Sequence, residues 1–294
     1  MANLKEVRTR IASVSSTQQI TSAMKMVSAA KFRRAQNAIV GMRPYSRQLG
    51  EIVADIDTGD GIQTPYHEER KLENVLLIVV TSNKGLCGAF NSNVIKQAQA
   101  RIDYYQASAT PEQPAHLAMI TIGKRCTEYF GKRFGNIVGS HDSLLDNATF
   151  DDVANLADGI MEQFCSKKYD RVELIYNQFK NSLVQILSTE QWLPIVTKST
   201  SDATHQSNND YIYEPSKETI LREMIPLMLR SHFYRVILDS LASEHGARMN
   251  AMQKATDNAT ELLKELRLSY NKARQAAITN EIIEIVSGSE ALKG

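Results

Sequence analysis

The sequence MQKATDNATELLKELRLSYNKARQA, residues 252–276, carries the clearest structural signal in the chain. Small and apolar residues recur in it at spacings of three and four, which is the pattern of a coiled-coil seam. The seam residues are Met252, Ala255, Ala259, Leu262, Leu266, Ser269, Ala273 and Ala276. After YIYEPS at 211–216, only Pro226 and Gly246 interrupt the helical pattern as far as Ser287, so we predict a C-terminal shaft helix over 211–288. At about 1.5 Å per residue, this helix would be roughly 100 Å long.

A second long helix is predicted at the N-terminus, over residues 1–56. Residues 1–40 contain neither glycine nor proline and are rich in strong helix formers. The apolar stripe comprises Leu4, Val7, Ile11 and Val14 and, after a polar break at Gln18, resumes one step shifted at Ile20, Met24 and Val27. Because each helix presents a stripe that needs a partner, we expect the two to pair antiparallel as a shaft.

The middle of the chain, residues 70–198, has a different pattern. The run VLLIVV at 75–80 is typical of a strand buried on both faces. A turn at Gly85 and Gly88 follows, and then a helix capped by Asn91 or Ser92 that runs to about Ala107. Further strands are predicted at 117–122, 171–179 and 184–195, with a helix at 150–167. This alternation predicts a Rossmann-like α/β domain inserted between the two shaft helices.

Composition narrows the class of protein. The 294 residues carry a net charge of +1 and only three cysteines, Cys87, Cys126 and Cys165, without a CxxC pair. We therefore expect a reduced compartment and neither disulfides nor zinc clusters. Charged residues interrupt the N-terminus and every long apolar window, so we expect neither a signal peptide nor a membrane span.

Catalytic and cofactor motifs are weak. The turn GLCG at 85–88 follows a strand, as phosphate-binding turns do, but neither GxGxxG nor GxxxxGK[ST] is matched. The six histidines lack HExxH spacing. Asp151 and Asp152 follow Thr149 and fit the first turn of a helix, where the dipole favours acids. We predict no catalytic residues, no cofactor and no metal site.

The N-terminal helix is strongly basic, with nine Lys or Arg against Glu6 alone in residues 1–47. A helical nucleic-acid-binding protein is therefore the main alternative function. Aromatic residues that could stack on bases are nearly missing from this region, which has only Phe32 and Tyr45. Acidic loops of a protein partner explain the charge equally well, and so does a solvated surface.

Three stretches carry a resemblance to a known family: residues 6–36, the turn SNKGLCGAFN at 82–91, and residues 243–288. Over nearly the whole chain the sequence resembles the gamma subunits of bacterial F-type ATP synthases. One departure is Ser289 after Gly288, where the family commonly has alanine. The cysteine insert of the chloroplast relatives is missing, so the resemblance predicts no thiol control.

The resemblance implies a rotor subunit that is not itself the catalyst. The shaft turns inside a ring of alpha and beta subunits and couples proton flow to ATP chemistry in the beta subunits. The base of the shaft binds the epsilon subunit and the membrane c ring, so the protein is peripheral on the cytoplasmic face of the bacterial cell membrane. No nucleic acid is involved.

Residue roles follow where the motifs match. The implied ring contacts are Met24, Arg248, Gln275, Thr279 and Glu281, and the foot that meets the c ring and epsilon comprises Tyr211, Tyr213 and Glu214. Lys31, Arg33 and Arg34, which we call the basic collar, are expected to face acidic loops of the ring.

Overall fold

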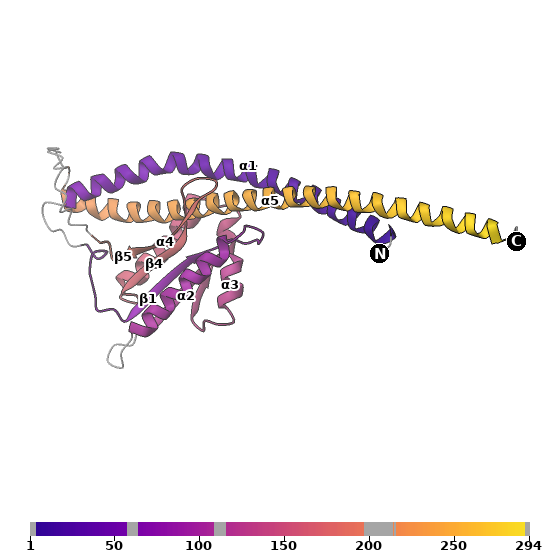
Figure 1. Cartoon of the computed structure of the whole chain (residues 1–294). Helices are drawn as coiled ribbons and strands as arrows, with labels where there is room; N and C mark the ends of the chain where they lie inside the picture. The colour runs from indigo at the N-terminus through magenta and orange to yellow at the C-terminus, as the bar shows by residue number, and fades with distance from the viewer. Residues whose placement is uncertain (1–3, 58–63, 109–115, 197–213, 215, 292–294) are drawn as a thin grey trace. The chain divides into compact units, whose positions relative to one another are not determined.

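The computed structural model describes residues 4–57, 64–108, 116–196, 214 and 216–291. The chain forms two compact units, one of residues 1–29 with 248–294 and the other of residues 30–247. Two helices, α1 (Leu4–Asp57) and α5 (Lys217–Ala291), each contribute to both units (Figure 1). Among the described helices, none is long and apolar enough to cross a membrane.

A five-stranded sheet organises the larger unit, in the order β3-β2-β1-β4-β5. The strands are β1 (Asn74–Val80), β2 (His116–Ile122), β3 (Ile137–Ser140), β4 (Arg171–Phe179) and β5 (Gln185–Leu193). The first four are parallel, and β5 pairs antiparallel with β4. The predicted α/β fold between two long helices is confirmed, with an antiparallel edge that the sequence pattern did not indicate.

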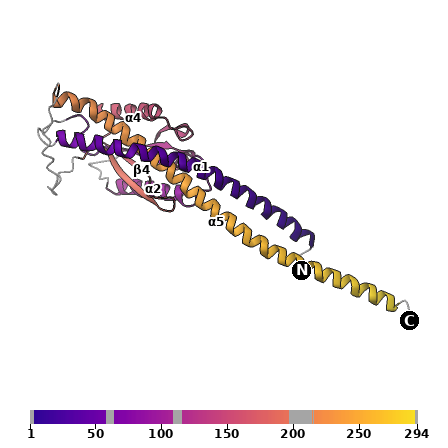
Figure 2. The same cartoon turned by 90° about the horizontal axis from the view of Figure 1, so that it is seen from above.

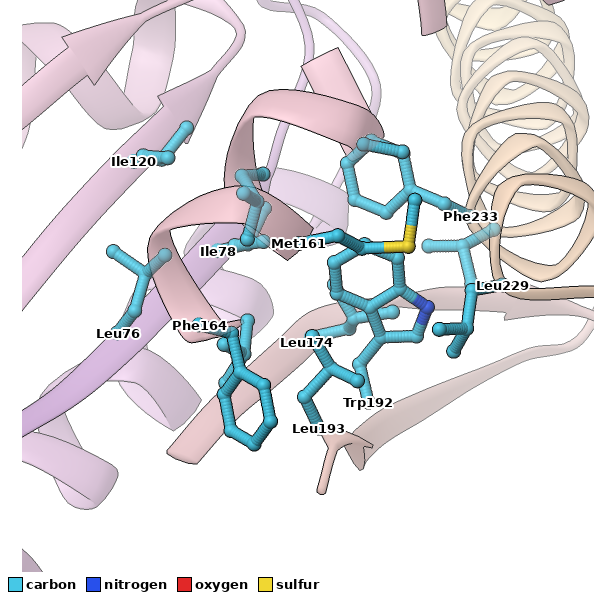
Figure 3. Close-up of a cluster of buried hydrophobic side chains, with 14 of the residues drawn as sticks. Leu76, Ile78, Ile120, Met161, Phe164, Leu174, Trp192, Leu193, Leu229 and Phe233 are labelled. Atoms are coloured by element: carbon cyan, nitrogen blue, oxygen red, sulfur yellow. The ribbon is translucent and has the colours of Figure 1, made fainter. Parts of the chain in front are cut away.

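Helices cover both faces of the sheet, which explains why residues 75–80 are all apolar. On one face α2 (Phe90–Ser108) and α3 (Lys124–Phe130) pack on Val75, Leu77 and Val79. On the other face lie α4 (Phe150–Cys165), the first part of α5 and the end of α1. Figure 3 shows this second core, which includes Leu76, Ile78, Met161, Phe164, Trp192 and Phe233.

Helix starts follow local capping chemistry in one case and not in another. The Thr149 hydroxyl accepts a hydrogen bond from the Asp152 amide, which confirms the predicted first turn of α4. The cap predicted at Asn91 or Ser92 is wrong, because α2 already begins at Phe90. The Asn91 side chain instead accepts from the Ser82 amide at 2.9 Å and so fixes the preceding turn.

Short elements escaped the sequence patterns. These are α3, β3 and the 3-10 turn Asp142–Leu145. The start of α3 depends on Gly123, whose φ is 108° and where a Cβ would lie 2.6 Å from the Thr81 carbonyl oxygen. Only glycine fits such a position, and a contact with Thr81, the residue that follows β1, decides it.

In the smaller unit the start of α1 and the end of α5 run in opposite directions, as Figures 1 and 2 show. Two hydrogen bonds fix the antiparallel pairing. Gln18 Nε2 donates to Thr260 Oγ1 at 2.7 Å, and the hydroxyls of Thr21 and Thr256 lie 2.8 Å apart. The Thr21 hydroxyl also reaches the Gln18 carbonyl, and that of Thr256 the Met252 carbonyl.

The predicted stripe on α1 needs a correction. Ile20 and Val27 are 57% and 58% exposed, whereas Thr21 and Ser28 are buried. The inward line therefore continues from Val14 without the predicted shift, since helix geometry keeps the same face inward whatever residues occupy it. Gln18, Thr21 and Ser28 on that line form hydrogen bonds.

The predicted seam on α5 needs a similar correction. Met252 and Ala259 are buried as expected, but Leu263 is buried in place of Leu262. Ser269 and Ala276 are exposed, and so are all side chains from 274 to 289. The helix pair therefore ends near Ala273, and α5 extends beyond the start of α1 (Figure 2).

Candidate interaction surfaces

The end of α5 exposes five large aliphatic side chains in one short stretch. They are Ile278, Ile282, Ile283, Ile285 and Val286, each about half or more exposed. Monomeric soluble proteins rarely leave so much apolar surface together in water. This end of the helix is the most evident candidate for a buried contact with another protein.

The ring-contact residues expected near this end are accessible. Gln275, Thr279 and Glu281 are all exposed, and the Thr279 hydroxyl donates to the Gln275 carbonyl oxygen at 2.9 Å. They lie along the same stretch of helix as the exposed aliphatic side chains, so a partner would meet apolar and polar groups together. The sequence signal for the apolar surface is IIEIV at 282–286, which lies beyond the seam.

A second surface lies beside the hydrogen-bonded part of the helix pair. A groove of about 290 Å³ is lined by Gln18, Gln19, Ser22, Ala23, Met26 and Thr256. Met26 is exposed, and so are Ile20 and Val27, whereas the expected contact residue Met24 is half-buried. Of these outward apolar side chains, Ile20 and Val27 were predicted to point inward, whereas Met26 was not part of the predicted stripe.

Arg248 differs from the other expected contacts. Its exposed fraction is 7%, so the chain itself covers most of this side chain. The foot is described only at Glu214, which is exposed, while Tyr211 and Tyr213 lie outside the described residues.

The residues of the basic collar flank Phe32, a buried side chain that attaches this part of α1 to the core. Lys31, Arg33 and Arg34 are exposed, but Phe32 between them is buried and meets the Phe179 ring edge-on at 5.6 Å between centroids. Buried Ile39, Leu238 and Ala242 complete this cluster. The anchor holds the three charges on the surface side of α1.

The turn after β1 offers little nucleophilic chemistry. Cys87 is buried, and the Asn91 side-chain amide lies 3.1 Å from its sulfur. Burial also raises the pKa of the Cys126 thiol. Within the described ranges, no group of three His, Cys, Asp or Glu side chains is arranged to hold a metal ion.

Two partly buried polar contacts were not foreseen. Glu190 on β5 accepts from the Tyr176 hydroxyl at 2.8 Å and lies 3.1 Å from His232 Nε2 on α5. The hydrogen bond from His232 lowers the pKa of Glu190, and burial raises the pKa of Tyr176. Separately, Arg43 on α1 contacts Asp239 on α5 at 3.0 Å. No local sequence signal links residues so far apart along the chain.

Comparisons with known proteins agree on one family. The family model described as ATP synthase matches residues 3–292. The ATP synthase gamma chains of Flavobacterium johnsoniae and Geobacter metallireducens are 52% and 42% identical, each over 100% of both chains. That of Cytophaga hutchinsonii is 50% identical over 99% of both.

Solved structures show the same fold at lower sequence identity. A chain in the rotor of the Euglena gracilis mitochondrial ATP synthase is 21% identical, with a TM-score of 0.62 over 94% of this chain and 98% of that one. A chain in the OSCP/F1/c-ring structure of the same enzyme gives 0.66 at 22% identity, over 98% and 94%.

Proposed function

The chain belongs to the ATP synthase gamma chain family, and we propose that it is a rotor that transmits rotation without catalysing the chemistry itself. Its partners would be the alpha and beta subunits around the helix pair, and epsilon and the c ring at the base. The observation that carries the proposal is full-length similarity to gamma chains, joined to an apolar helix end that is exposed in the chain alone. The family gives no support to the nucleic-acid alternative.

The end of α5 suits a rotating contact. Apolar side chains such as Ile282 and Ile283 pack without fixed bond directions, so they can slide past a partner at similar energy in many angular positions. Gln275, Thr279 and Glu281 would add polar contacts that form and break during the turn. We infer that this end enters the central opening of the alpha and beta ring.

The groove on α1 would make a second ring contact. Met26, Ile20 and Val27 are exposed there, and Met24 on the same stretch of helix is half-buried. Methionine adapts its shape easily, which suits a surface that meets successive partners. Because Arg248 is buried, we infer that it supports this region from within and does not contact the ring directly.

The basic collar would face acidic loops of the ring. Each exposed charge pair contributes only about 0–1 kcal/mol, so the three charges guide the contact and do not lock it. At the other end, exposed Glu214 together with Tyr211 and Tyr213 would form the foot against epsilon and the c ring. The protein would thus sit on the cytoplasmic face of the bacterial membrane, attached through its complex.

Reconstitution tests this proposal. The purified chain is mixed with alpha and beta subunits, and ATP hydrolysis, complex formation and retention on heparin are measured. We expect the chain alone to hydrolyse no ATP and to enter a complex with alpha and beta. Hydrolysis by the chain alone, or retention on heparin without binding to alpha and beta, would contradict the proposal.

A further inference from the structure

One segment of α1 is poorly suited to a helix. Residues 41–50, GMRPYSRQLG, begin and end with glycine and contain Pro44 inside the helix. Proline cannot donate the backbone hydrogen bond, and its ring crowds the carbonyl one turn earlier. Each glycine also weakens a helix relative to alanine. The helix nevertheless runs without interruption from Leu4 to Asp57.

Packing compensates for this weakness only in part, through Met42, which packs against the Phe32 cluster, and through buried Leu49. From Val40 to Gln48 no side chain is fully buried. The nearest buried side chains are Ile39 on one side and Leu49 on the other. Between them only Met42 and Ser46 are half-buried. The segment therefore needs another source of stability.

Arg43 supplies polar contacts in the middle of this segment. Its Nη2 donates to the Phe179 carbonyl oxygen at 2.7 Å and to Asp239 Oδ1 at 3.0 Å. One guanidinium nitrogen carries two N–H groups, so both bonds can form together. Phe179 ends β4 and Asp239 lies on α5, so the side chain joins α1 to two other elements.

The acceptor is well placed to make this contact strong. The Asp239 side chain is 1% exposed and that of Arg43 is 44% exposed, so water partly screens the donor. Hydrogen bonds to charged groups are nevertheless stronger than neutral ones. The neighbouring charged or titratable groups are Arg235 on α5, Glu190 on β5 and Tyr176 on β4. Arg43 and Arg235 favour the carboxylate of Asp239, against its burial.

We propose that residues 41–50 form a hinge in α1 and that Arg43 is the latch that holds it closed against α5 and β4. With the latch released, this segment opens locally while the sheet core stays packed. Ile39 before the segment and Leu49 near its end are both buried, so the opening is confined to the turns between them. The chain thus has a defined segment, residues 41–50, in which α1 can bend.

Hydrogen exchange on the full chain tests the latch. Arg43→Met keeps much of the side-chain volume but removes the donors. We expect amides in 41–50 to exchange about tenfold faster, as befits the loss of charge-assisted hydrogen bonds. The matched control is Arg47→Met, one turn later, whose side chain is 80% exposed and pairs with Glu51 on the same helix. It should leave exchange unchanged.

A rescue variant separates a hinge from general damage. A Cβ at Gly41 or Gly50 meets nothing within 4 Å, so alanine fits at both positions. Gly41→Ala with Gly50→Ala, added to Arg43→Met, should slow exchange again by roughly tenfold. Equal acceleration in β1 would show that Arg43 supports the whole fold, and unchanged exchange in 41–50 would show that it holds nothing. Either result overturns the proposal.

Discussion

Two apolar runs of similar composition have opposite environments in this molecule. VLLIVV in β1 is completely buried between two layers of helices. IIEIV at 282–286 lies on the last turns of α5, where its aliphatic side chains are at least half exposed. Burial of the first run stabilises the folded chain without any partner. The second run is expected to be covered only in a complex. Apolar sequence alone therefore does not distinguish a core from an interface.

The largest expected effect compares the same substitution in both runs. Ile78→Ala should lower the free energy of unfolding by about 2–5 kcal/mol, because it leaves a cavity in the sheet core. Ile283→Ala should lower it by less than about 0.5 kcal/mol, since the side chain is already exposed. Urea unfolding of the purified chain measures both. Similar losses would mean that the end of α5 is packed in the free chain.

The second prediction concerns the assembled enzyme, where substitutions at the end of α5 should have the larger effect. Ile282→Ser with Ile283→Ser should reduce ATP-driven proton pumping by roughly three- to tenfold, because each serine removes apolar area from the ring contact. Thermal unfolding of the free chain should hardly change. Ser289→Ala, on the same exposed helix end, is the control. Normal pumping by the double variant would remove this surface from the rotor contact.

The basic collar allows a charge test. Reversing Lys31, Arg33 and Arg34 to Glu should impair pumping more than folding, and high salt should partly restore it because screening weakens the repulsion. A single neutral substitution should be nearly silent. ATP-driven proton pumping and ATP hydrolysis, each measured at low and high salt concentration, test this prediction. If the variant with all three charges reversed pumps protons as well as the parent, the basic collar is only a solvent-exposed surface and contacts no partner.

Acid should weaken one contact of the sheet. Because His232 lowers the pKa of Glu190 below its ordinary 4.5, the pair stabilises the fold above that pH and loses its effect as pH falls through the lowered value. His232→Leu should therefore cost about 0.5–1.5 kcal/mol at pH 6 and less near pH 3. Urea unfolding across pH checks this. A difference that grows in acid would contradict the assignment.

The smallest expected effect concerns the polar part of the helix pair. Gln18→Ala should cost less than about 1 kcal/mol, because one lost hydrogen bond is partly offset by the better helix former. Gln19→Ala, at an exposed neighbouring position, should be neutral or slightly stabilising. Thermal unfolding compares them. If the two behave alike, the bond to Thr260 contributes nothing measurable.

Much of the fold could be predicted because its signals are local. The run at 75–80 and the cap at Thr149 are each contained within a few residues. The predicted apolar stripe on α1 is wrong at Ile20 and Val27, because hydrophobicity alone placed these side chains inward. Helix geometry instead turns Thr21 and Ser28 inward. Gly123 and the Arg43–Asp239 pair depend on contacts between distant segments, which no local pattern reports. The contact residues rested on family resemblance, and Arg248 shows that resemblance does not indicate accessibility.

The threonine pair between the helices has two protons for three short contacts. Either Thr256 donates to Thr21, which donates to the Gln18 carbonyl, or Thr21 donates to Thr256, which donates to the Met252 carbonyl. Both arrangements keep one hydrogen bond between the helices. The hydrogen bond between the Thr21 and Thr256 hydroxyls can therefore run in either direction, and the two hydroxyl groups keep some rotational freedom. Small displacements of one helix along the other can change which proton is used without breaking the connection.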